Sequence, residues 1–227
     1  MNSSNKIIKP STIKEQVYNM LKEQILDGTI KPGEWLQEKK LAEMFNVSRS
    51  PVREVLIELV GEGLLENIPN KGVFVKVLNS KDIYNIFELR EILEQYAIKK
   101  AVELATEDDV KVLKAVYKQL EESYNNGDVN EYSKVDTIIH NTIFSISGND
   151  MLEDIVKNLY PQIQSFRTIS LFNKKRYEES FIEHKGLIEG IIEKDYEKAW
   201  RHDSIHLKLA RDEILKHIES LGQSEIK

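Results

Sequence analysis

The stretch from Ile25 to Val77 reads ILDGTIKPGEWLQEKKLAEMFNVSRSPVREVLIELVGEGLLENIPNKGVFVKV. It contains two short segments with apolar residues at helical spacing, joined by the tight turn Asn46-Val47-Ser48. Two short apolar runs follow, Leu64–Ile68 and Val73–Val77, with Gly72 at the tip between them, where a tight turn needs a permissive backbone. This order predicts two helices and a β-hairpin wing, the arrangement of a winged helix-turn-helix, a fold that usually reads duplex DNA.

The two predicted helices have clear beginnings and apolar faces. The first covers Gln37–Phe45. Ser48 and Ser50 are favourable N-caps for the second, and Pro51 suits its first turn, where a missing N–H needs no partner. Its inward-facing residues are expected to be Val52, Val55, Leu56, Leu59 and Val60.

Arg49 and Arg53 lie four residues apart, so they share the outer face of the second helix near its start. A recognition helix presents this end to the major groove, where an arginine can bind guanine O6 and N7 or hold a phosphate. The alternative is a solvated, non-functional helix face. The turn, caps, core spacing and wing all agree with DNA recognition, so we favour that interpretation.

Composition excludes several classes of protein. With 227 residues, 41% of them hydrophobic, the chain suits two modest domains with packed cores. No apolar run approaches the roughly 20 residues of a membrane span, and residues 1–10 lack the apolar core of a signal peptide. The absence of cysteine removes disulfides, thiolate catalysis and Cys-based zinc sites. We expect a cytoplasmic protein with no membrane partner.

The net charge of −6 is unevenly distributed. Residues 1–78 hold 11 of the 32 basic and 10 of the 38 acidic side chains, so the acidic excess lies beyond them. Phosphate contacts depend on the local field, so the first part can still present positive charge to DNA. An acidic second part should weaken non-specific nucleic-acid binding.

Residues 78–227 show helical periodicity and no convincing strand. Asn79-Ser80 and Thr106 are predicted caps, and Gly148-Asn149 is a predicted helix-ending pair. The predicted helices run from the Asn79-Ser80 cap to Leu104 and over Thr106–Tyr124, Glu131–Ser147, Met151–Ser170 (interrupted near Pro161), Lys174–Glu193 and Tyr196–Leu221. We therefore expect a mainly α protein with two domains, a winged domain at 1–77 and an all-α bundle at 78–227.

Histidines lie on inward-facing stripes of three predicted helices. Asp136 and His140 are four residues apart on one helix, so both project from one face. His184 lies on the apolar stripe of the predicted helix Lys174–Glu193. On the last predicted helix, periodicity cannot choose between His202 and His206. Such N and O ligands suit Zn²⁺, Ni²⁺, Co²⁺ or Mn²⁺. The alternative is that these are hydrogen-bonded core histidines, with Asp136 and His140 forming only a side-chain hydrogen bond.

The first half resembles the DNA-binding domain of GntR-type bacterial regulators. The family pattern is matched by Gly28–Leu36, Leu41–Glu54, Gly63-Leu64 and Gly72–Val75. The resemblance implies DNA contacts from Arg49 and Arg53, and from Ser50 and the wing glycine Gly72. It also implies a contact from Lys39, at a position where the family often has a basic residue. As a lysine, it cannot bind in the bidentate manner of an arginine. The expected DNA-binding residues are Lys39, Ser48, Arg49, Ser50, Arg53, Lys71 and Gly72.

The second half resembles the helical effector domain of FadR-type GntR regulators, called FCD. Its marks are the segment Leu89–Glu94, a D-x-x-x-H, Gly148-Asn149, Glu183-His184 and Asp195 eleven residues before His206. Many members bind a divalent metal through one aspartate and three histidines. The resemblance implies the ligands Asp136, His140, His184 and His206.

The same resemblance implies a small organic acid as effector at the metal's open side. Arg90 matches a family arginine able to pair with a carboxylate, and Arg167 is a second candidate. For Arg90 the alternative is a surface ion pair with Glu94. We expect a homodimer that reads a palindromic operator, acts as a ligand-responsive regulator, most simply a repressor, and is not an enzyme.

Three alternatives remain open from the sequence. The metal ion itself could be the signal, without an organic ligand. Asp/His₃ with open coordination positions also suits a metal-dependent hydrolase, although no general base is evident beside it. An effector domain without metal could instead take an acyl chain, as in some relatives.

Overall fold

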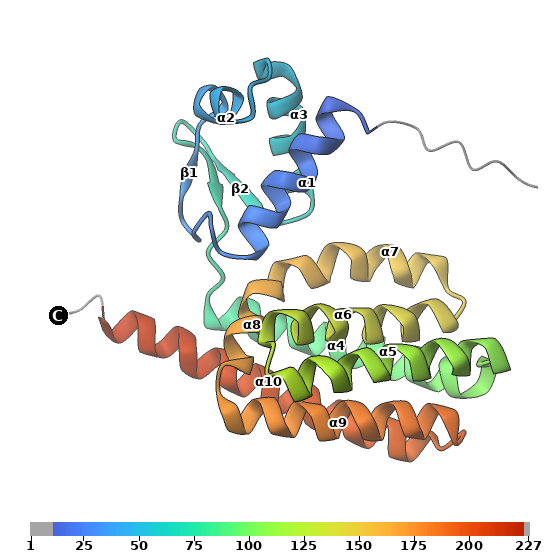
Figure 1. The fold of residues 1–227 in the computed structure, drawn as a ribbon. Helices are drawn as coiled ribbons and strands as arrows, with labels where there is room; N and C mark the ends of the chain where they lie inside the picture. Colours follow the sequence, from blue (N-terminus) through green and yellow to red (C-terminus); the bar gives the residue numbers. More distant parts are fainter. Residues whose placement is uncertain (1–10, 225–227) are drawn as a thin grey trace, which may run out of the picture. The chain divides into compact units, whose positions relative to one another are not determined.

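The computed structural model describes residues 11–224, apart from the side chains of 158, 163, 165, 166, 169 and 221–224. The expectation about a signal peptide in residues 1–10 lies outside the described residues. The chain divides into two compact units, residues 1–77 and 78–227, each described by itself below (Figure 1).

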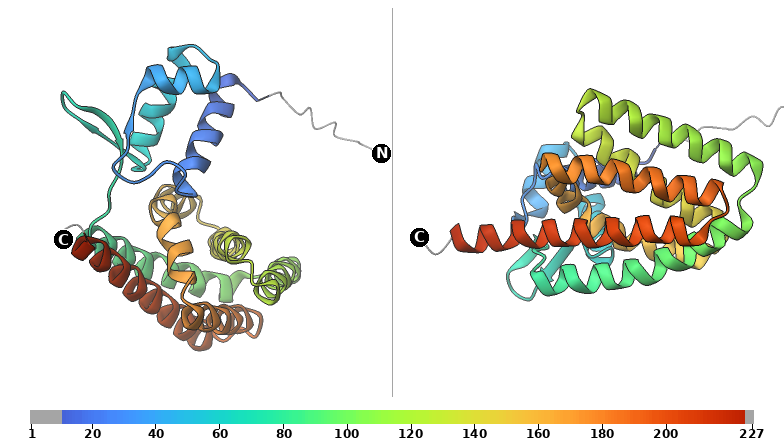
Figure 2. Two further views of the ribbon diagram at one scale, coloured as in Figure 1. Left: turned by 60° about the vertical axis from the view of Figure 1, so that its left-hand side comes forward. Right: turned by 90° about the horizontal axis from the view of Figure 1, so that it is seen from below.

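From residue 11 onward, the first unit contains three helices and a small sheet (Figure 1). Its elements are α1 (Ile13–Leu26), β1 (Trp35–Leu36), α2 (Glu38–Phe45), α3 (Arg49–Gly61), β2 (Leu65–Ile68) and β3 (Gly72–Val75). The sheet is antiparallel, with β3 between β1 and β2. The β2–β3 hairpin extends away from the helices as a wing (Figure 2, left). The predicted winged helix-turn-helix is therefore confirmed as the fold of this unit.

Some local details differ from the prediction. Ser48 is the N-cap residue of α3, but its side chain makes no capping hydrogen bond. Ser50 is not a cap: it lies inside the first turn, and its Oγ donates to Glu54 Oε1 at 3.4 Å. The prediction also omitted α1 and the two-residue β1, because the helix-turn-helix signal begins after α1 and β1 exists only through its pairing with β3.

The core of the first unit lies between the three helices and the sheet. Val52, Val55 and Leu59 of α3 are fully buried, as their spacing predicted. They pack with Leu21 of α1 and Leu65 of β2. Burial of these side chains fixes the face of α3 that points outward.

The second unit consists of helices alone over its described residues. They are α4 (Ser80–Leu104), α5 (Glu107–Asn126), α6 (Val129–Ile146), α7 (Asp150–Leu159), the 3₁₀ turn η1 (Tyr160–Ile163), α8 (Gln164–Leu171), α9 (Lys174–Ile192) and α10 (Tyr196–Ser224). The Asn79 and Thr106 side chains form capping boxes, as their residue types predicted. The interruption predicted near Pro161 is η1. The all-α prediction is confirmed for this unit.

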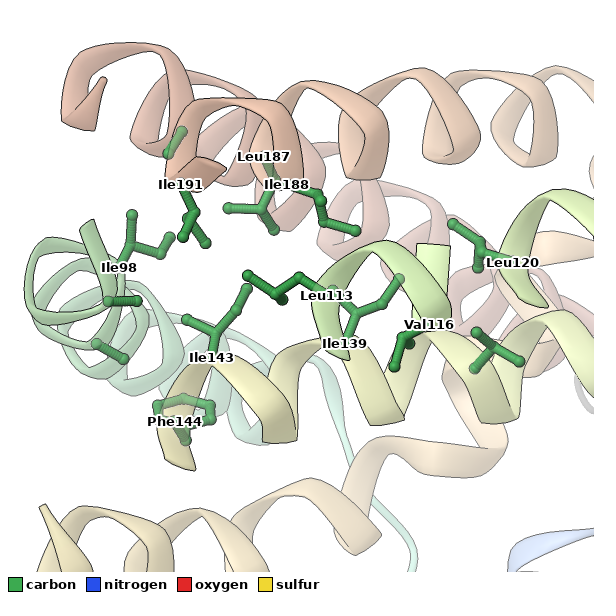
Figure 3. Packing of buried hydrophobic residues seen from close by; sticks show 14 of the residues in the cluster. Ile98, Leu113, Val116, Leu120, Ile139, Ile143, Phe144, Leu187, Ile188 and Ile191 are labelled. Atoms are coloured by element: carbon green, nitrogen blue, oxygen red, sulfur yellow. The ribbon is translucent and has the colours of Figure 1, made fainter. Parts of the chain in front are cut away.

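The main core of this unit is formed by α4, α5, α6 and α9. Figure 3 shows side chains from these four helices pointing into one shared space. They include Ile98 of α4, Leu113 of α5, Ile139 of α6 and Ile191 of α9, each 1% exposed or less. This packing holds the inward face of α6, which carries Asp136 and His140, toward α9.

Two glycines let α9 and α10 approach closely. A Cβ on Gly186 would lie 2.3 Å from the His202 ring, and one on Gly190 would lie 2.4 Å from the Ala199 backbone nitrogen. The helices are therefore in contact at both points, which brings His184 and His206 to neighbouring positions. Within the described residues, none of the helices combines the length and the apolar character that a membrane span requires.

Candidate metal centre and nucleic-acid interface

The predicted DNA-binding residues lie on one side of the helix-turn-helix and on the wing. Lys39 of α2, together with Ser48, Arg49, Ser50 and Arg53 at the start of α3, is exposed. Lys71 at the wing tip is exposed and Gly72 is half-buried. The buried stripe of α3 leaves both arginines on its outer face, as four-residue spacing requires.

Arg53 has a partner that the sequence did not reveal. Its Nε and Nη2 each donate to one oxygen of Glu38, at 2.8 Å. The bond with Arg53 lowers the pKa of the Glu38 carboxyl. Both side chains are solvent-exposed, at 65% and 34%, so the pair orients Arg53 without sequestering it.

The wing tip depends on two residues with positive φ. Asn70 has φ +62° and Gly72 has φ +106°. The Lys71 N–H donates to the Ile68 carbonyl, closing a turn with Pro69 second and Asn70 third. A Cβ on Gly72 would lie 2.8 Å from Trp35 Nε1, so the glycine also makes room for the indole of β1.

The four predicted metal ligands converge inside the second unit. Asp136 and His140 come from α6, His184 from α9 and His206 from α10, and all are at most 5% exposed. The Nε2 atoms of the three histidines lie 2.7 Å (His184), 3.7 Å (His206) and 3.9 Å (His140) from Asp136 Oδ1. The four residues can each offer one ligand atom within 4.8 Å of the others. His202, the alternative to His206, instead packs on Gly186.

The Nδ1 atom of each histidine faces an acceptor. His140 Nδ1 lies 2.7 Å from Glu94 Oε2, His206 Nδ1 lies 3.0 Å from Glu183 Oε2, and His184 Nδ1 lies 2.8 Å from the Ser180 carbonyl oxygen. A carbonyl oxygen only accepts, so His184 carries its proton on Nδ1. Metal-binding histidines are commonly held in this way, with the ring oriented by a carboxylate or carbonyl.

The ligand atoms of this cluster would fit a divalent cation, because some of them are buried and make no hydrogen bond to a described residue. In the neutral His184 ring with its proton on Nδ1, Nε2 would present a lone pair to Asp136 Oδ1, which lies 2.7 Å away and forms no hydrogen bond with it. His140 Nε2 is also buried, with no hydrogen-bond partner among the described residues. Lone pairs directed at one another in a dry interior are unfavourable unless a cation lies between them.

The charges around the cluster also favour the protonation states that bind a metal ion. Burial opposes the charge on Asp136, but Arg167 outweighs it and holds the pKa of Asp136 well below the usual range. Burial lowers the pKa of His140, and burial together with Arg176 lowers that of His206 further. An ionised carboxylate and neutral imidazoles are the forms that bind metal.

Sequence reasoning missed the carboxylates that support this cluster. Glu94 of α4 contacts His140, and Glu183 is held by two hydrogen bonds from Arg176, at 2.7 and 3.1 Å. Asp203 is fully buried three residues before His206; its Oδ1 lies 3.9 Å from His140 Nδ1, and neither oxygen has a hydrogen bond to a described residue. Burial together with Glu94 raises the pKa of Asp203 well above the usual range. The one feature of the sequence that could have indicated these three carboxylates is their position on the inward-facing sides of their helices.

The two predicted effector arginines are buried and already engaged. Arg90 Nε donates to Glu94 Oε1 at 2.7 Å, so the predicted alternative ion pair exists, but in the interior and not on the surface. Within the described part of the chain, its Nη1 and Nη2 have no hydrogen-bond partner. Arg167 Nη2 lies 3.1 Å from Asp136 Oδ2, and its Nη1 donates to Thr137. Arg167 thus holds the Asp136 oxygen that points away from the histidines.

Comparisons with known proteins agree with this architecture. The gntR family of bacterial regulatory proteins matches residues 13–75, and the FCD domain matches residues 85–209. The chain is 31% identical over 220 residues to the uncharacterised HTH-type transcriptional regulator YdhC of Bacillus subtilis (strain 168), covering 96% of this chain and 97% of that protein. It is 30% identical over 210 residues to the gluconate operon transcriptional repressor of the same strain, covering 90% and 84%.

A solved structure shows the same fold over nearly the whole chain. E. coli McbR/YncC superposes with a TM-score of 0.78 at 25% identity, covering 92% of this chain and 99% of that one. The matching families and relatives are transcriptional regulators and not enzymes. The chain belongs to the GntR family of DNA-binding bacterial transcriptional regulators, and its C-terminal half is an FCD domain.

Proposed function

We propose that this regulator binds a palindromic operator as a homodimer, and that a divalent metal and a small carboxylate effector in the FCD domain control that binding. The observation that carries the proposal is the convergence of Asp136, His140, His184 and His206 on one buried point, with each Nδ1 facing an acceptor. Zinc, nickel or manganese would suit these ligands.

DNA recognition would fall to the exposed start of α3 and to the wing. Arg49 and Arg53 would read base edges or phosphates, Ser48 and Ser50 would bind the backbone, and Lys39 would hold a phosphate as a point charge. Lys71 and Gly72 would approach the adjacent groove. Two copies related by a two-fold axis would read the two halves of the operator, in the cytoplasm where the DNA is.

The effector would bind beside the metal ligands. Arg90 offers two buried NH₂ groups, Nη1 and Nη2, without hydrogen-bond partners among the described residues, since Glu94 occupies its Nε. An incoming carboxylate would satisfy both groups in a bidentate pair. Arg167 is tied to Asp136 and is better suited to orienting that ligand. A metal would supply a strong positive centre that draws the acid group inward.

The sign of regulation is proposed as repression relieved by effector. The similarity to the gluconate operon transcriptional repressor supports repression. For tenfold regulation the effector must prefer one state of the protein by only about 1.4 kcal/mol. A conformational shift of modest energy at the linker near Val77 would suffice.

The test begins with metal analysis of the purified protein. A thermal-shift screen of small carboxylic acids follows, and operator affinity is then measured with metal alone and with metal plus each stabilising acid. We expect near-stoichiometric metal, and an acid that changes operator affinity only when metal is present. A response to metal alone would make the ion the signal. Binding and response that survive metal removal would overturn the proposal.

A further inference from the structure

Glu94 connects the histidine cluster to the helix that follows the DNA-binding unit. It lies on α4, which begins two residues after the boundary at Val77 and Leu78. The four clustered residues lie on α6, α9 and α10. Glu94 makes a polar contact from α4 to one of these histidines, through Oε2 and His140 Nδ1 at 2.7 Å.

The Glu94 carboxylate is held by hydrogen bonds at one oxygen, while the other lies at ion-pair distance from His140 without hydrogen-bond geometry. Its Oε1 accepts hydrogen bonds from Arg90 Nε and from Tyr160 Oη, each at 2.7 Å. Its Oε2 faces His140, and the whole side chain is 2% exposed. Arg90 also lies 5.0 Å from the Phe87 ring, within the same helix. A displacement of the His140 ring would therefore be resisted by α4 and not absorbed by a mobile side chain.

The other two histidines are oriented without α4. His206 is held by Glu183 and His184 by the Ser180 carbonyl, both groups of α9. Glu183 resembles Glu94 chemically, because it is a buried carboxylate that faces a histidine Nδ1 and is backed by an arginine, Arg176. Glu183 therefore provides an internal control: it has the same chemistry but lies on a different helix.

We propose that Glu94 is a positioning residue that couples occupancy of the histidine cluster to α4, and through α4 to the DNA-binding unit. The proposal rests on the proposed function, because it requires the cluster to bind metal. In this arrangement Glu94 faces His140 from α4, while the bonds from Arg90 of α4 and from Tyr160 of η1 hold its carboxylate in place. Glu183 orients His206 from α9, so its loss should leave the Glu94 link to α4 in place.

The test compares amide hydrogen exchange of the full-length protein in chelator and in saturating Zn²⁺. In the wild type we expect Zn²⁺ to slow exchange both in α4 (80–104) and in α9–α10. Both E94Q and E183Q should weaken Zn²⁺ binding by about 10- to 100-fold, as expected when such an outer carboxylate is lost. At saturation, E94Q should lose the protection of α4 and keep that of α9–α10, whereas E183Q should keep the protection of α4.

The outcomes separate this inference from the proposed function. If the wild type binds no Zn²⁺, the metal proposal fails and this inference with it. If Zn²⁺ binds but leaves α4 exchange unchanged, or if E94Q retains the wild-type protection of α4, only the coupling is refuted. Equal loss in both variants would also refute it. Should E94Q misfold because Arg90 is left unpaired, R90Q/E94Q removes both charges together, and the wild-type exchange result stands regardless.

Discussion

Part of the Arg53 guanidinium, its Nε and Nη2, is bound by Glu38. The salt bridge aligns the side chain along the outer face of α3, and its 65% exposure leaves it accessible. Lys39 on α2 has only a 3.9 Å contact with Glu43. The two basic residues therefore differ in preorganisation as well as in chemistry, and they should contribute differently to DNA binding.

Arg53→Ala should weaken operator binding by about 1–3 kcal/mol and relax base preference at one operator position, because a bidentate base contact is lost. Lys39→Ala should weaken all sequences about equally and reduce the salt dependence, as expected for a single phosphate contact. Both are measured by titrating operator variants at two salt concentrations. A uniform loss for Arg53→Ala would reduce that residue to a phosphate contact.

Substitution of Gly72 should destabilise the protein in two ways, by backbone strain and by steric overlap, and a substitution at Gly28 distinguishes the two. Gly72→Ala should lower the free energy of unfolding by about 1–3 kcal/mol, since it strains a positive φ and drives a methyl group into Trp35. Gly28, with φ +79° and no atom near its missing Cβ, should show the backbone cost alone. Chemical denaturation of both variants measures the difference. Equal losses would mean that Trp35 moves aside freely.

The helix face that each candidate site residue occupies could be predicted better than its contacts. The spacing of Arg49 and Arg53 and of Asp136 and His140 fixes which face each occupies. The Glu38–Arg53 and Glu94–His140 contacts join residues 15 and 46 positions apart in the sequence, on different helices. Periodicity describes one helix at a time, so it cannot reveal such contacts, nor that Arg90 is buried and not on the surface.

At the scale of elements, capping residues and glycines gave reliable boundaries. Asn79 and Thr106 start α4 and α5, and Gly148, at φ +67°, follows the end of α6. Strand β1 could not be predicted, because its two residues gain their conformation only from pairing with Phe74 and Val73. The close approach of α9 and α10 was also not foreseen, although Gly186 and Gly190 have the four-residue spacing that permits it.

Gly190→Ala should push α9 and α10 apart, because its methyl would lie 2.4 Å from the Ala199 nitrogen. Overpacking of this kind costs about 1–3 kcal/mol in unfolding free energy. Metal affinity should fall as well, since His184 and His206 lie on these two helices. Gly61→Ala in α3, where no atom lies within 4 Å, should be neutral or slightly stabilising. Thermal unfolding and metal titration of both variants test this; a Gly190→Ala protein with wild-type values would contradict the close packing.

At the scale of the whole molecule, the distribution of charge separates two tasks. The acidic excess lies beyond residue 78, in the unit that holds the histidine cluster, while the first unit is nearly neutral overall and places its exposed arginines at the start of α3. A net charge of −6 therefore does not contradict DNA binding. The overall composition does not show this division between the two units, but the positions of the charged residues along the sequence do.

Metal binding should stabilise the whole chain through His206 and not through His202. At a free Zn²⁺ concentration about 100 times the dissociation constant, linkage adds about 2.7 kcal/mol to the unfolding free energy, which for a chain of this size corresponds to a rise in Tm of about 5–10 °C. His206→Ala should abolish this rise, because its Nε2 is one of the converging ligand atoms. His202→Ala, one helical turn earlier on α10, removes a ring that packs on Gly186, so it should lower the starting Tm but preserve the Zn²⁺-dependent increase. Differential scanning calorimetry with and without chelator measures both quantities. If His202→Ala abolished the increase while His206→Ala retained it, the ligand assignment on α10 would have to be reversed.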